Sequence, residues 1–438
     1  MTVLNAREIA VLTLSTILEE SGYNNIVLNQ SLNKYNDISP MDRAMVTEIV
    51  NGTLRNLILI DHIISLHSKT PVKRPYIRNL LRISVYQLIF MDKVPDSAVC
   101  NEAVRIAKAK GLGGLSGYVN GVLRNAARNK GNWQLPDRGK NLAEYLSVFY
   151  SHPKWLIKYW LSFMNEDKVA ALCESNNISP TAILSVNTEK ITVEALEALL
   201  EDEGVKTWKP GHKNAIKVKG TGDISRLESF KNGYYHIMDI NAMKAVDLIN
   251  PVPEDLLIDL CAAPGGKSFY AANLMSNRGE ILSLDIHEHK LNLIAEGVKR
   301  LGFSIIKESL NDAAVFNENY ADKWDKVMLD VPCSGLGVLA KKPDARYKKS
   351  MKDIDSLVKI QRAMLLASYR YPKIGGRLLY STCTISIKEN EENIAWFLEK
   401  FPYKIEKELT MLPVSNEGTD IDIDIGDGFY AVSMIRCE

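Results

Sequence analysis

The stretch that decides the fold is Leu256-Leu257-Ile258-Asp259-Leu260-Cys261-Ala262-Ala263-Pro264-Gly265-Gly266-Lys267-Ser268. Its apolar run at 256–260 lies between Pro253 and the Pro-Gly-Gly of 264–266, which predicts a central parallel strand that runs through a tight turn into a helix. Paired glycines let a ligand approach the backbone, and the amides at the start of a helix attract electron-rich groups. We therefore expect a cofactor loop here, although an isolated Pro-Gly-Gly is equally typical of a plain turn.

A second strand-like run follows at residues 280–287 and carries Asp285, which lies 18 residues after Lys267. In an open α/β sheet, an acid at the end of the second strand hydrogen-bonds a ribose diol. The spacing therefore predicts a cofactor that contains a nucleoside, without saying which one.

The totals favour a globular protein of two or three domains, because 438 residues are many for one core. With 46% hydrophobic and 24% charged residues, a disordered chain is excluded, and no apolar run reaches the 18 or so residues of a membrane span. The N-terminus has an Arg7-Glu8 charge pair where a signal peptide would be apolar. The six cysteines are scattered without a CxxC pair, so we expect reduced thiols, no metal site and a cytoplasmic protein without membrane contact.

The net charge of +1 hides an uneven distribution. Residues 1–150 carry 18 Lys and Arg against 12 Asp and Glu, and residues 69–140 carry 14 against 4. A local excess of this size indicates a polyanionic partner, with an ordinary solvated helix surface as the alternative.

Three segments with different patterns follow one another along the chain. Residues 1–130 read as helices, since apolar residues recur at helical spacing in 97–110 and 119–128 and glycines separate the two. After a linker at 129–140, strands at 182–186, 215–218 and from 234 alternate with helices at 193–203 and 224–230, which fits a small α+β domain of ferredoxin or RNA-recognition type.

From about residue 240, strands and helices alternate in the manner of a doubly wound parallel sheet. We expect strands at 256–260, 280–286, 304–308, 326–331 and 376–382, and helices at 267–275, 288–301, 354–370 and 388–400. Two further strands at 404–409 and 429–436 are predicted as an antiparallel pair at the edge.

Two of these strands end close to a cysteine. Asp330 lies near the end of the strand at 326–331 and Cys333 follows it, while Cys383 follows the strand at 376–382. Because the functional edge of an open sheet lies beyond its strand ends, these side chains are expected to meet near the glycine turn. A single cysteine at such a position is more often a small buried hydrophobic residue.

Four motifs together resemble those of the Nol1/Nop2/Sun-type RNA cytosine-C5 methyltransferases. They are Asp259-Leu260-Cys261-Ala262-Ala263-Pro264-Gly265-Gly266-Lys267, Asp330-Val331-Pro332-Cys333-Ser334-Gly335, Ser381-Thr382-Cys383-Thr384 and Gly428-Phe429-Tyr430-Ala431. The N-terminal segment resembles the NusB-like RNA-binding helical domain in the stretches 97–104 and 118–125. The resemblance implies an all-α NusB-like domain at 1–135, a small α+β domain at 145–238 and a Rossmann-like class I methyltransferase domain at 239–438.

By this resemblance the cofactor is S-adenosyl-L-methionine. The residues expected to bind it are Cys261, Ala262, Ala263, Pro264, Gly265, Gly266, Lys267, Asp285, Asp312 and Asp330. Asp285 would take the ribose hydroxyls, and Asp312 would lie by the adenine, although Asn311 fits as well. The family commonly has Gln-Asp where this chain has Met238-Asp239, so residues 238–243 stay unassigned.

The resemblance also implies the chemistry. A thiolate that adds to carbon 6 of cytosine makes carbon 5 nucleophilic enough to take a methyl group, and free cysteine is only a few per cent ionised at neutral pH. In the family the nucleophile is the cysteine of Thr-Cys-Thr, hence Cys383, while Cys333 assists product release; chemistry alone does not say which thiol attacks. Asp330 would hydrogen-bond the amino edge of the base, with capping of backbone amides as its alternative role.

The NusB-like segment favours 16S ribosomal RNA as the partner, bound by a monomer. Candidate phosphate contacts are Lys73, Arg74, Arg78, Arg82, Lys108, Arg124 and Arg128. The alternatives are a transfer RNA enzyme of the same family and a catalytically silent RNA-binding assembly factor. A nicotinamide oxidoreductase would also explain Asp285. It would leave the paired cysteines unexplained, and the chain lacks the GxGxxG spacing of that class.

Overall fold

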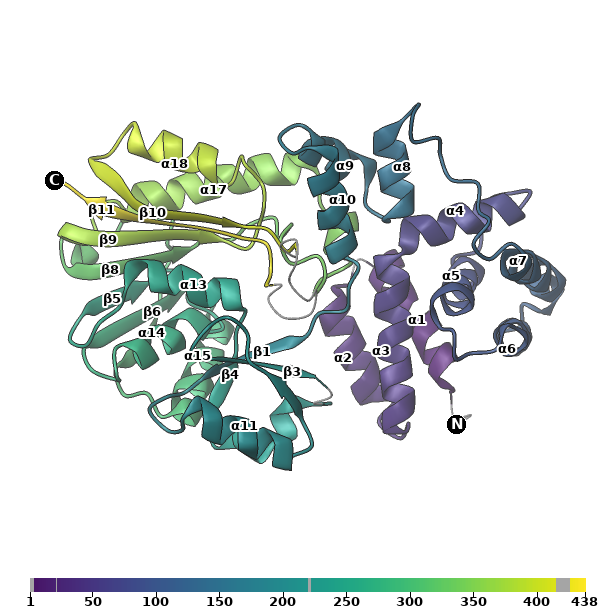
Figure 1. Ribbon diagram of the computed structural model, residues 1–438, viewed down its shortest axis with the longest axis horizontal. Coiled ribbons are helices and arrows are strands. Elements are labelled where there is room, and N and C mark those ends of the chain that lie inside the picture. Colours follow the sequence, from purple (N-terminus) through teal and green to yellow (C-terminus); the bar gives the residue numbers. More distant parts are fainter. Residues whose placement is uncertain (1–3, 21, 220–221, 415–425) are drawn as a thin grey trace. The chain divides into compact units, whose positions relative to one another are not determined.

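A computed structural model describes residues 4–20, 22–219, 222–414 and 426–438 (Figure 1). Contacts divide the chain into two compact units. The first unit consists of Met1–Ser179 and Leu339–Lys348, and the second consists of Pro180–Val338 and Lys349–Glu438.

The first unit is helical, as the apolar periodicity predicts for residues 1–130. Its helices are α1 (Ala6–Glu19), α2 (Asn24–Lys34), α3 (Pro40–Arg55), α4 (Leu57–His67), α5 (Pro75–Phe90), α6 (Asp96–Ala109), α7 (Ser116–Arg128), α8 (Leu142–Phe149), α9 (Lys154–Leu161), α10 (Glu166–Ser175) and α16 (Ala345–Lys348). Local sequence sets several ends: Asn5 and Glu8 form a capping box at α1, and Ser39 caps α3 ahead of Pro40.

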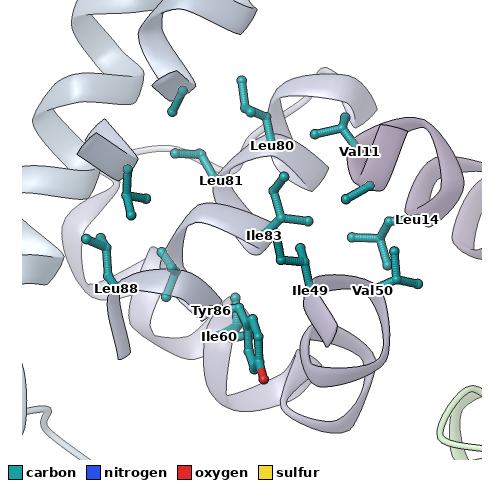
Figure 2. Close-up of a cluster of buried hydrophobic side chains, with 14 of the residues drawn as sticks. Val11, Leu14, Ile49, Val50, Ile60, Leu80, Leu81, Ile83, Tyr86 and Leu88 are labelled. Atoms are coloured by element: carbon teal, nitrogen blue, oxygen red, sulfur yellow. The ribbon is translucent and has the colours of Figure 1, made fainter. Parts of the chain in front are cut away.

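Helix α5 lies at the centre of this unit's core. Figure 2 shows Val11 and Leu14 of α1 and Ile49 of α3 in one cluster with Ile83 of α5. All four are fully buried, and each such side chain contributes about 1.5–3 kcal/mol when it leaves water. The close approach of α3 to α5 requires a glycine at position 52, because a Cβ atom there would lie 1.9 Å from Tyr86 Cζ.

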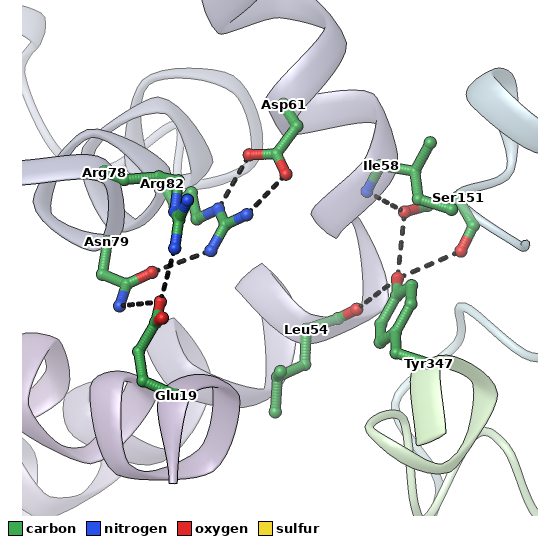
Figure 3. Close-up of polar contacts among 9 residues, drawn as sticks. All are labelled: Glu19, Leu54, Ile58, Asp61, Arg78, Asn79, Arg82, Ser151 and Tyr347. Atoms are coloured by element: carbon green, nitrogen blue, oxygen red, sulfur yellow. Dashed lines mark hydrogen bonds and ion pairs between the residues drawn. The ribbon is translucent and has the colours of Figure 1, made fainter. Parts of the chain in front are cut away.

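A short segment from the C-terminal half of the chain completes the first unit. Arg346 of α16 is fully buried and donates hydrogen bonds to the backbone oxygens of Arg55, Ser151 and Asn176. The Tyr347 hydroxyl donates to Leu54 O at 2.8 Å (Figure 3). The sequence pattern placed 339–348 inside a domain that spans 239–438, whereas its contacts group it, together with helices α8–α10, with the first unit.

The second unit begins with a small four-stranded sheet of order β2-β3-β1-β4, antiparallel throughout. Its elements are β1 (Ala182–Val186), α11 (Val193–Asp202), β2 (Lys206–Trp208), β3 (Ala215–Lys219), α12 (Glu228–Lys231) and β4 (Tyr235–Ile237). The predicted α+β unit is confirmed, but β2 was missed. This edge strand is only three residues long and has exposed Lys206 and Trp208, so it shows no burial alternation.

The larger sheet has seven strands in the order β10-β11-β9-β8-β5-β6-β7. They are β5 (Leu256–Asp259), β6 (Glu280–Asp285), β7 (Ile306–Leu310), β8 (Trp324–Asp330), β9 (Pro372–Thr382), β10 (Tyr403–Met411) and β11 (Phe429–Arg436). Strands β5 to β9 are parallel, while β11 pairs antiparallel with β9 and with β10 at the edge. The predicted parallel sheet with an antiparallel edge pair is therefore confirmed.

Helices cover both faces of this sheet (Figure 1). Helices α13 (Ile240–Ile249), α14 (Gly266–Leu274) and α15 (Glu288–Leu301) pack on one face, and α17 (Met351–Ser368) and α18 (Glu391–Leu398) pack on the other. Leu257 joins the first apolar cluster and its neighbour Ile258 joins the second, since successive strand side chains point to opposite faces. Within the described ranges, no single helix is long and apolar enough to cross a membrane; only the bent pair α3 and α4 meets that test together.

Candidate active site

The turn between β5 and α14 is shaped by its glycines and by the side chains beneath it. Gly265 has φ +108°, a left-handed conformation that favours glycine, and a Cβ there would lie 2.3 Å from Phe269 Cζ. A Cβ on Gly266 would meet nothing within 4 Å, so space is open above the turn. His236 Nε2 lies 3.1 Å from Gly266 O, and burial lowers the pKa of His236 to about 3, so the neutral ring donates this hydrogen bond.

Asp259 lies under the same turn and is fully buried. Its Oδ2 accepts a hydrogen bond from Ser268 Oγ at 2.7 Å, while its buried Oδ1 has no hydrogen-bond partner among the described residues. Burial raises the pKa of Asp259 to about 6, although Ser268 and Lys267 oppose this shift. A buried acceptor without a partner beside an open turn fits a ligand that brings hydrogen-bond donors.

The ends of β6 and β7 provide a second acid between apolar side chains. Asp285 is buried and accepts from His287 N at 3.0 Å, with Lys290 Nζ at 3.5 Å. The register pairs Asp285 with Leu310, which is 57% exposed, and the adjacent Ile286 is 53% exposed. Exposed apolar residues beside a buried acid suit a ribose joined to a flat aromatic base.

Ile286 and Leu310 were not named from the sequence. Each is an apolar residue at or just beyond the end of a predicted strand, and such residues are common in a hydrophobic core. The nearby Asn311 Nδ2 is buried without a hydrogen-bond partner in the described part of the chain, whereas Asp312 Oδ1 accepts from Ala314 N at 2.9 Å. The amide of Asn311 is therefore the better candidate for a polar contact with a base.

An ion pair links the glycine turn to the end of β8. Lys267 Nζ donates to Asp330 Oδ2 at 2.7 Å, and Ser381 Oγ donates to Asp330 Oδ1 at 2.7 Å. Burial lowers the pKa of Lys267, but the Asp330 carboxylate outweighs this effect and the net pKa is raised, so the ammonium is held charged. The same ammonium lies 5.2 Å from the centre of the Phe429 ring.

The two cysteines predicted to converge lie next to this pair. Cys333 Sγ and Cys383 Sγ are 3.2 Å apart, and both are reduced cysteines of intermediate exposure. The hydrogen bond with Cys383, burial and nearby negative charge raise the pKa of Cys333 well above its usual value. Asp330, Cys333 and Cys383 thus come together at the carboxyl edge of the sheet, as the strand-end argument predicts.

The seven basic residues expected to contact phosphates fall into three groups. Lys73, Arg74, Lys108, Arg124 and Arg128 are exposed. Arg78 is half-exposed and pairs with Glu19 at 2.8 Å (Figure 3). Arg82 is buried and makes two hydrogen bonds to the Asp61 carboxylate, at 2.7 and 2.6 Å, so its guanidinium joins α5 to α4 inside the unit.

Two further features concern the start of α13 and the arrangement of the metal-ligating residue types. Asp239, which the sequence left unassigned, caps α13 by accepting from Asn241 N at 3.0 Å, and it also accepts from Asp427 N. In the ranges that the structure covers, no group of three His, Cys, Asp or Glu side chains is arranged to hold a metal ion.

Comparisons with known proteins agree along the chain. The family described as 16S rRNA methyltransferase RsmB/F matches residues 246–427, the NusB family matches 4–128, and the RsmF/B-like ferredoxin-like domain matches 152–225. The probable ribosomal RNA small subunit methyltransferase B of Bacillus subtilis (strain 168) is 36% identical over 404 residues, which cover 91% of this chain and 89% of that protein. The protein of the same name from Synechocystis is 35% identical, with 90% and 89% covered.

The crystal structure of PH0851 resembles the whole chain, with a TM-score of 0.78, 25% identity and 99% of each chain covered. The doubly wound sheet, its glycine turn and the acid at the end of β6 fit the class of S-adenosylmethionine-dependent methyltransferases, to which the matched family belongs. Within that class, the chain belongs to the RsmB/F family. The NusB-like, ferredoxin-like and Rossmann-like parts expected from the sequence are thereby confirmed.

Proposed function

We propose that this protein methylates carbon 5 of a cytosine in 16S ribosomal RNA through a covalent bond between Cys383 and carbon 6 of the base. The observation that carries the proposal is the 3.2 Å separation of the Cys333 and Cys383 sulfurs beside the Lys267–Asp330 ion pair. Relatives named ribosomal RNA small subunit methyltransferase B support ribosomal RNA as the substrate class. We also propose that the protein acts as a monomer in the cytoplasm.

Bound S-adenosylmethionine supplies an electrophilic methyl group, which the turn at 261–267, Asp285, Ile286 and Leu310 would hold. Cys383 gives its proton to solvent, and its thiolate forms a bond to carbon 6, which pushes an electron pair onto carbon 5. That pair would let carbon 5 take the methyl group that the cofactor supplies, with the electrons of the broken methyl–sulfur bond left on the cofactor's sulfur. Loss of the carbon 5 proton then restores the double bond and expels the Cys383 thiolate.

Cys333 is suited to the last step by its contact with Cys383. The largest cause of its raised pKa is the hydrogen bond with Cys383, and the charge of that neighbour adds to it. Once the Cys383 sulfur is bonded to carbon 6, its charge is gone, and as a thioether it accepts a hydrogen bond only weakly. The Cys333 thiol can then give its proton to solvent more readily, and the resulting thiolate can take the carbon 5 proton.

Asp330 and Lys267 would orient the base. The Asp330 carboxylate, fixed by Lys267 and Ser381, is an acceptor suited to the amino group of cytosine and not to the carbonyl oxygen of uracil. Asp330→Asn would keep the shape and add a donor, so we expect it to lower the preference for cytosine over uracil in adduct formation on fluorinated RNA.

The test of the cysteine roles uses small-subunit RNA that contains 5-fluorocytidine, in which fluorine replaces the carbon 5 proton that must leave before the thiolate is expelled. We expect a covalent RNA–protein adduct with the wild type and with Cys333→Ala, and none with Cys383→Ala. With ordinary cytidine, Cys333→Ala is expected to accumulate an adduct that the wild type resolves. Loss of the adduct in Cys333→Ala with retention in Cys383→Ala would reverse the assignment.

The exposed basic residues of the first unit would position the RNA through its phosphates. Because such contacts release counterions, the logarithm of the RNA-binding constant should fall linearly with the logarithm of the salt concentration, with a slope of about 0.7–0.9 per phosphate contact. We expect Lys73→Ala with Arg74→Ala to reduce the slope by roughly 1–2. The matched control is Lys34→Ala, an exposed lysine on α2 outside the basic segment, and a slope that does not change in the double variant would refute this surface.

A second candidate is a transfer RNA enzyme of the same family, and a third is an RNA-binding assembly factor without activity. The match of residues 4–128 to the NusB family favours ribosomal RNA over transfer RNA. Transfer of labelled methyl groups to unmodified small-subunit RNA and to bulk transfer RNA separates all three. Bisulfite mapping of RNA from cells without this protein would then locate the modified cytosine.

A further inference from the structure

A buried carboxylate holds the loop that carries Cys333. Glu389 lies in the turn between β9 and α18, and its side chain is fully buried. Oε1 accepts from Ser334 N at 2.8 Å and from Gln361 Nε2 at 3.0 Å, and Oε2 accepts from Ser334 Oγ at 2.5 Å. A buried carboxylate is tolerated only when such donors satisfy it, so the position of Ser334 is closely determined.

The same network reaches the second cysteine. Ser334 Oγ lies 2.8 Å from Thr384 Oγ1, and since the Ser334 hydroxyl donates to Glu389, the Thr384 hydroxyl is the donor in this contact. Ser334 directly follows Cys333, and Thr384 directly follows Cys383. One chain of hydrogen bonds, from Glu389 through Ser334 to Thr384, therefore joins the neighbours of the two sulfurs.

The network is anchored on regular structure. Gln361 of α17 donates to Pro332 O at 3.0 Å and accepts from Asn393 Nδ2 of α18 at 2.8 Å. The Tyr380 hydroxyl of β9 donates to Glu389 O at 2.6 Å. Because helices and a central strand hold the carboxylate in place, the network can transmit their rigidity to the cysteine loops.

We infer that Glu389, Ser334 and Thr384 are positioning residues that set the distance between the Cys333 and Cys383 sulfurs. None of the three need touch the base. Their role is to keep Cys333 near enough to resolve the adduct that Cys383 makes, so the catalytic meaning of the inference rests on the proposed function. The distance itself does not depend on that function, and it can be measured without RNA.

The first experiment measures how readily the two thiols form a disulfide. Glutathione disulfide oxidises them to one protein disulfide and is itself reduced to two glutathione thiols, and the sulfurs need move only from 3.2 Å to about 2.05 Å. Peptide mass mapping follows the 333–383 cross-link, with Cys333→Ala as the zero level. We expect Thr384→Val and Ser334→Ala to slow the cross-link roughly 5–10-fold, the effect of one lost hydrogen bond.

Conservative and remote variants serve as controls. Thr384→Ser keeps the hydroxyl and is expected to cross-link within about twofold of the wild type, a change below that of one hydrogen bond. Ser356→Ala removes an exposed serine from α17 and should change nothing. Glu389→Gln retains the shape and most hydrogen bonds, whereas Glu389→Ala removes all of them; if the alanine variant does not fold, the Ser334 and Thr384 variants still decide.

The second experiment measures adduct resolution on RNA with ordinary cytidine. Thr384→Val and Ser334→Ala are expected to accumulate the covalent RNA–protein complex, while their adduct on 5-fluorocytidine RNA forms as in the wild type. Cross-linking at the wild-type rate in both variants would overturn the inference. Slower cross-linking in an enzyme that methylates no cytosine would overturn the proposed function and leave the positioning network intact.

Discussion

Removal of the Lys267 ammonium should destabilise the second unit by an amount that depends on pH. The Lys267–Asp330 pair has an N–O distance of 2.7 Å, with side chains that are only 14% and 29% exposed. Removing one partner of a buried ion pair costs about 3–5 kcal/mol. Because Asp330 is partly exposed and keeps its hydrogen bond from Ser381, we expect about 2–3 kcal/mol for Lys267→Met at pH 8.

The sign of the pH dependence follows from the pKa values. The pKa of folded Lys267 is raised, so its contribution is complete at every pH below its unfolded value and is lost only as pH rises through the folded pKa. In Lys267→Met, the buried Asp259 loses the cation that lowers its pKa and can relieve the loss by taking up a proton. We therefore expect the destabilisation to be smaller at pH 5 than at pH 8.

The assay is hydrogen exchange of the amides in β5 and β8, read by mass spectrometry and corrected for intrinsic exchange rates at each pH. A double-mutant cycle with Asp330→Asn isolates the pair. The matched control is Lys290→Met, whose partner Asp285 lies at 3.5 Å and whose side chain is 40% exposed, for which about 0–1 kcal/mol is expected. A cost of Lys267→Met no larger than that of this control, or a coupling free energy below about 0.5 kcal/mol, would show that the ion pair does not stabilise the second unit.

Three further predictions concern other buried groups. The pKa of Asp259 is raised from 3.8 to about 6, so the folded state loses stability as pH rises through this range. In thermal unfolding, Asp259→Asn should therefore stabilise the second unit by up to about 3 kcal/mol at pH 8 but not at pH 4. An equal effect at both pH values would contradict this. Arg346→Met leaves several buried carbonyl oxygens without their donor and should cost about 3 kcal/mol or more, seen as faster hydrogen exchange in α3 and α10 and not in β5. Gly337→Ala would place a Cβ 1.9 Å from Gly428 O, so it should disrupt the Gly428 N–Gly337 O hydrogen bond and lower the melting temperature by several degrees, while Gly117→Ala, with open space around it, should not.

Most elements could be predicted because their signals are local. The apolar periodicity of α6 and α7 and the short apolar runs of β5, β6 and β8 follow from burial of one helix stripe or of a whole strand. The glycine turn, Asp285 and the cysteines could be placed at one sheet edge because parallel strands end on the same side. Some helix boundaries were predicted wrongly. Helix α18, for example, was predicted from 388 but begins at 391, because the side chains of Glu389 and Asn390 accept hydrogen bonds from residues outside the helix.

Other features left no local signal. Ile286 and Leu310 were not assigned from the sequence, and only the sheet shows that both are exposed beside Asp285. Arg82 counts as a surface charge in the sequence, but its ion pair with Asp61 across 21 residues depends on how α4 meets α5. Such contacts join residues far apart in the chain, so neither propensity nor spacing encodes them visibly.

The sequence by itself determined the strands of both sheets except β2, the glycine turn, and which strand ends carry an acid or a thiol, because each of these depends on residues within about one turn or strand. Only the tertiary structure decided that 339–348 belongs to the first unit, that the sulfurs of Cys333 and Cys383 lie 3.2 Å apart, and that Glu389 holds both loops. These features arise from packing between segments 50 or more residues apart, where the position of a side chain is set by burial and by the hydrogen-bond partners that burial demands.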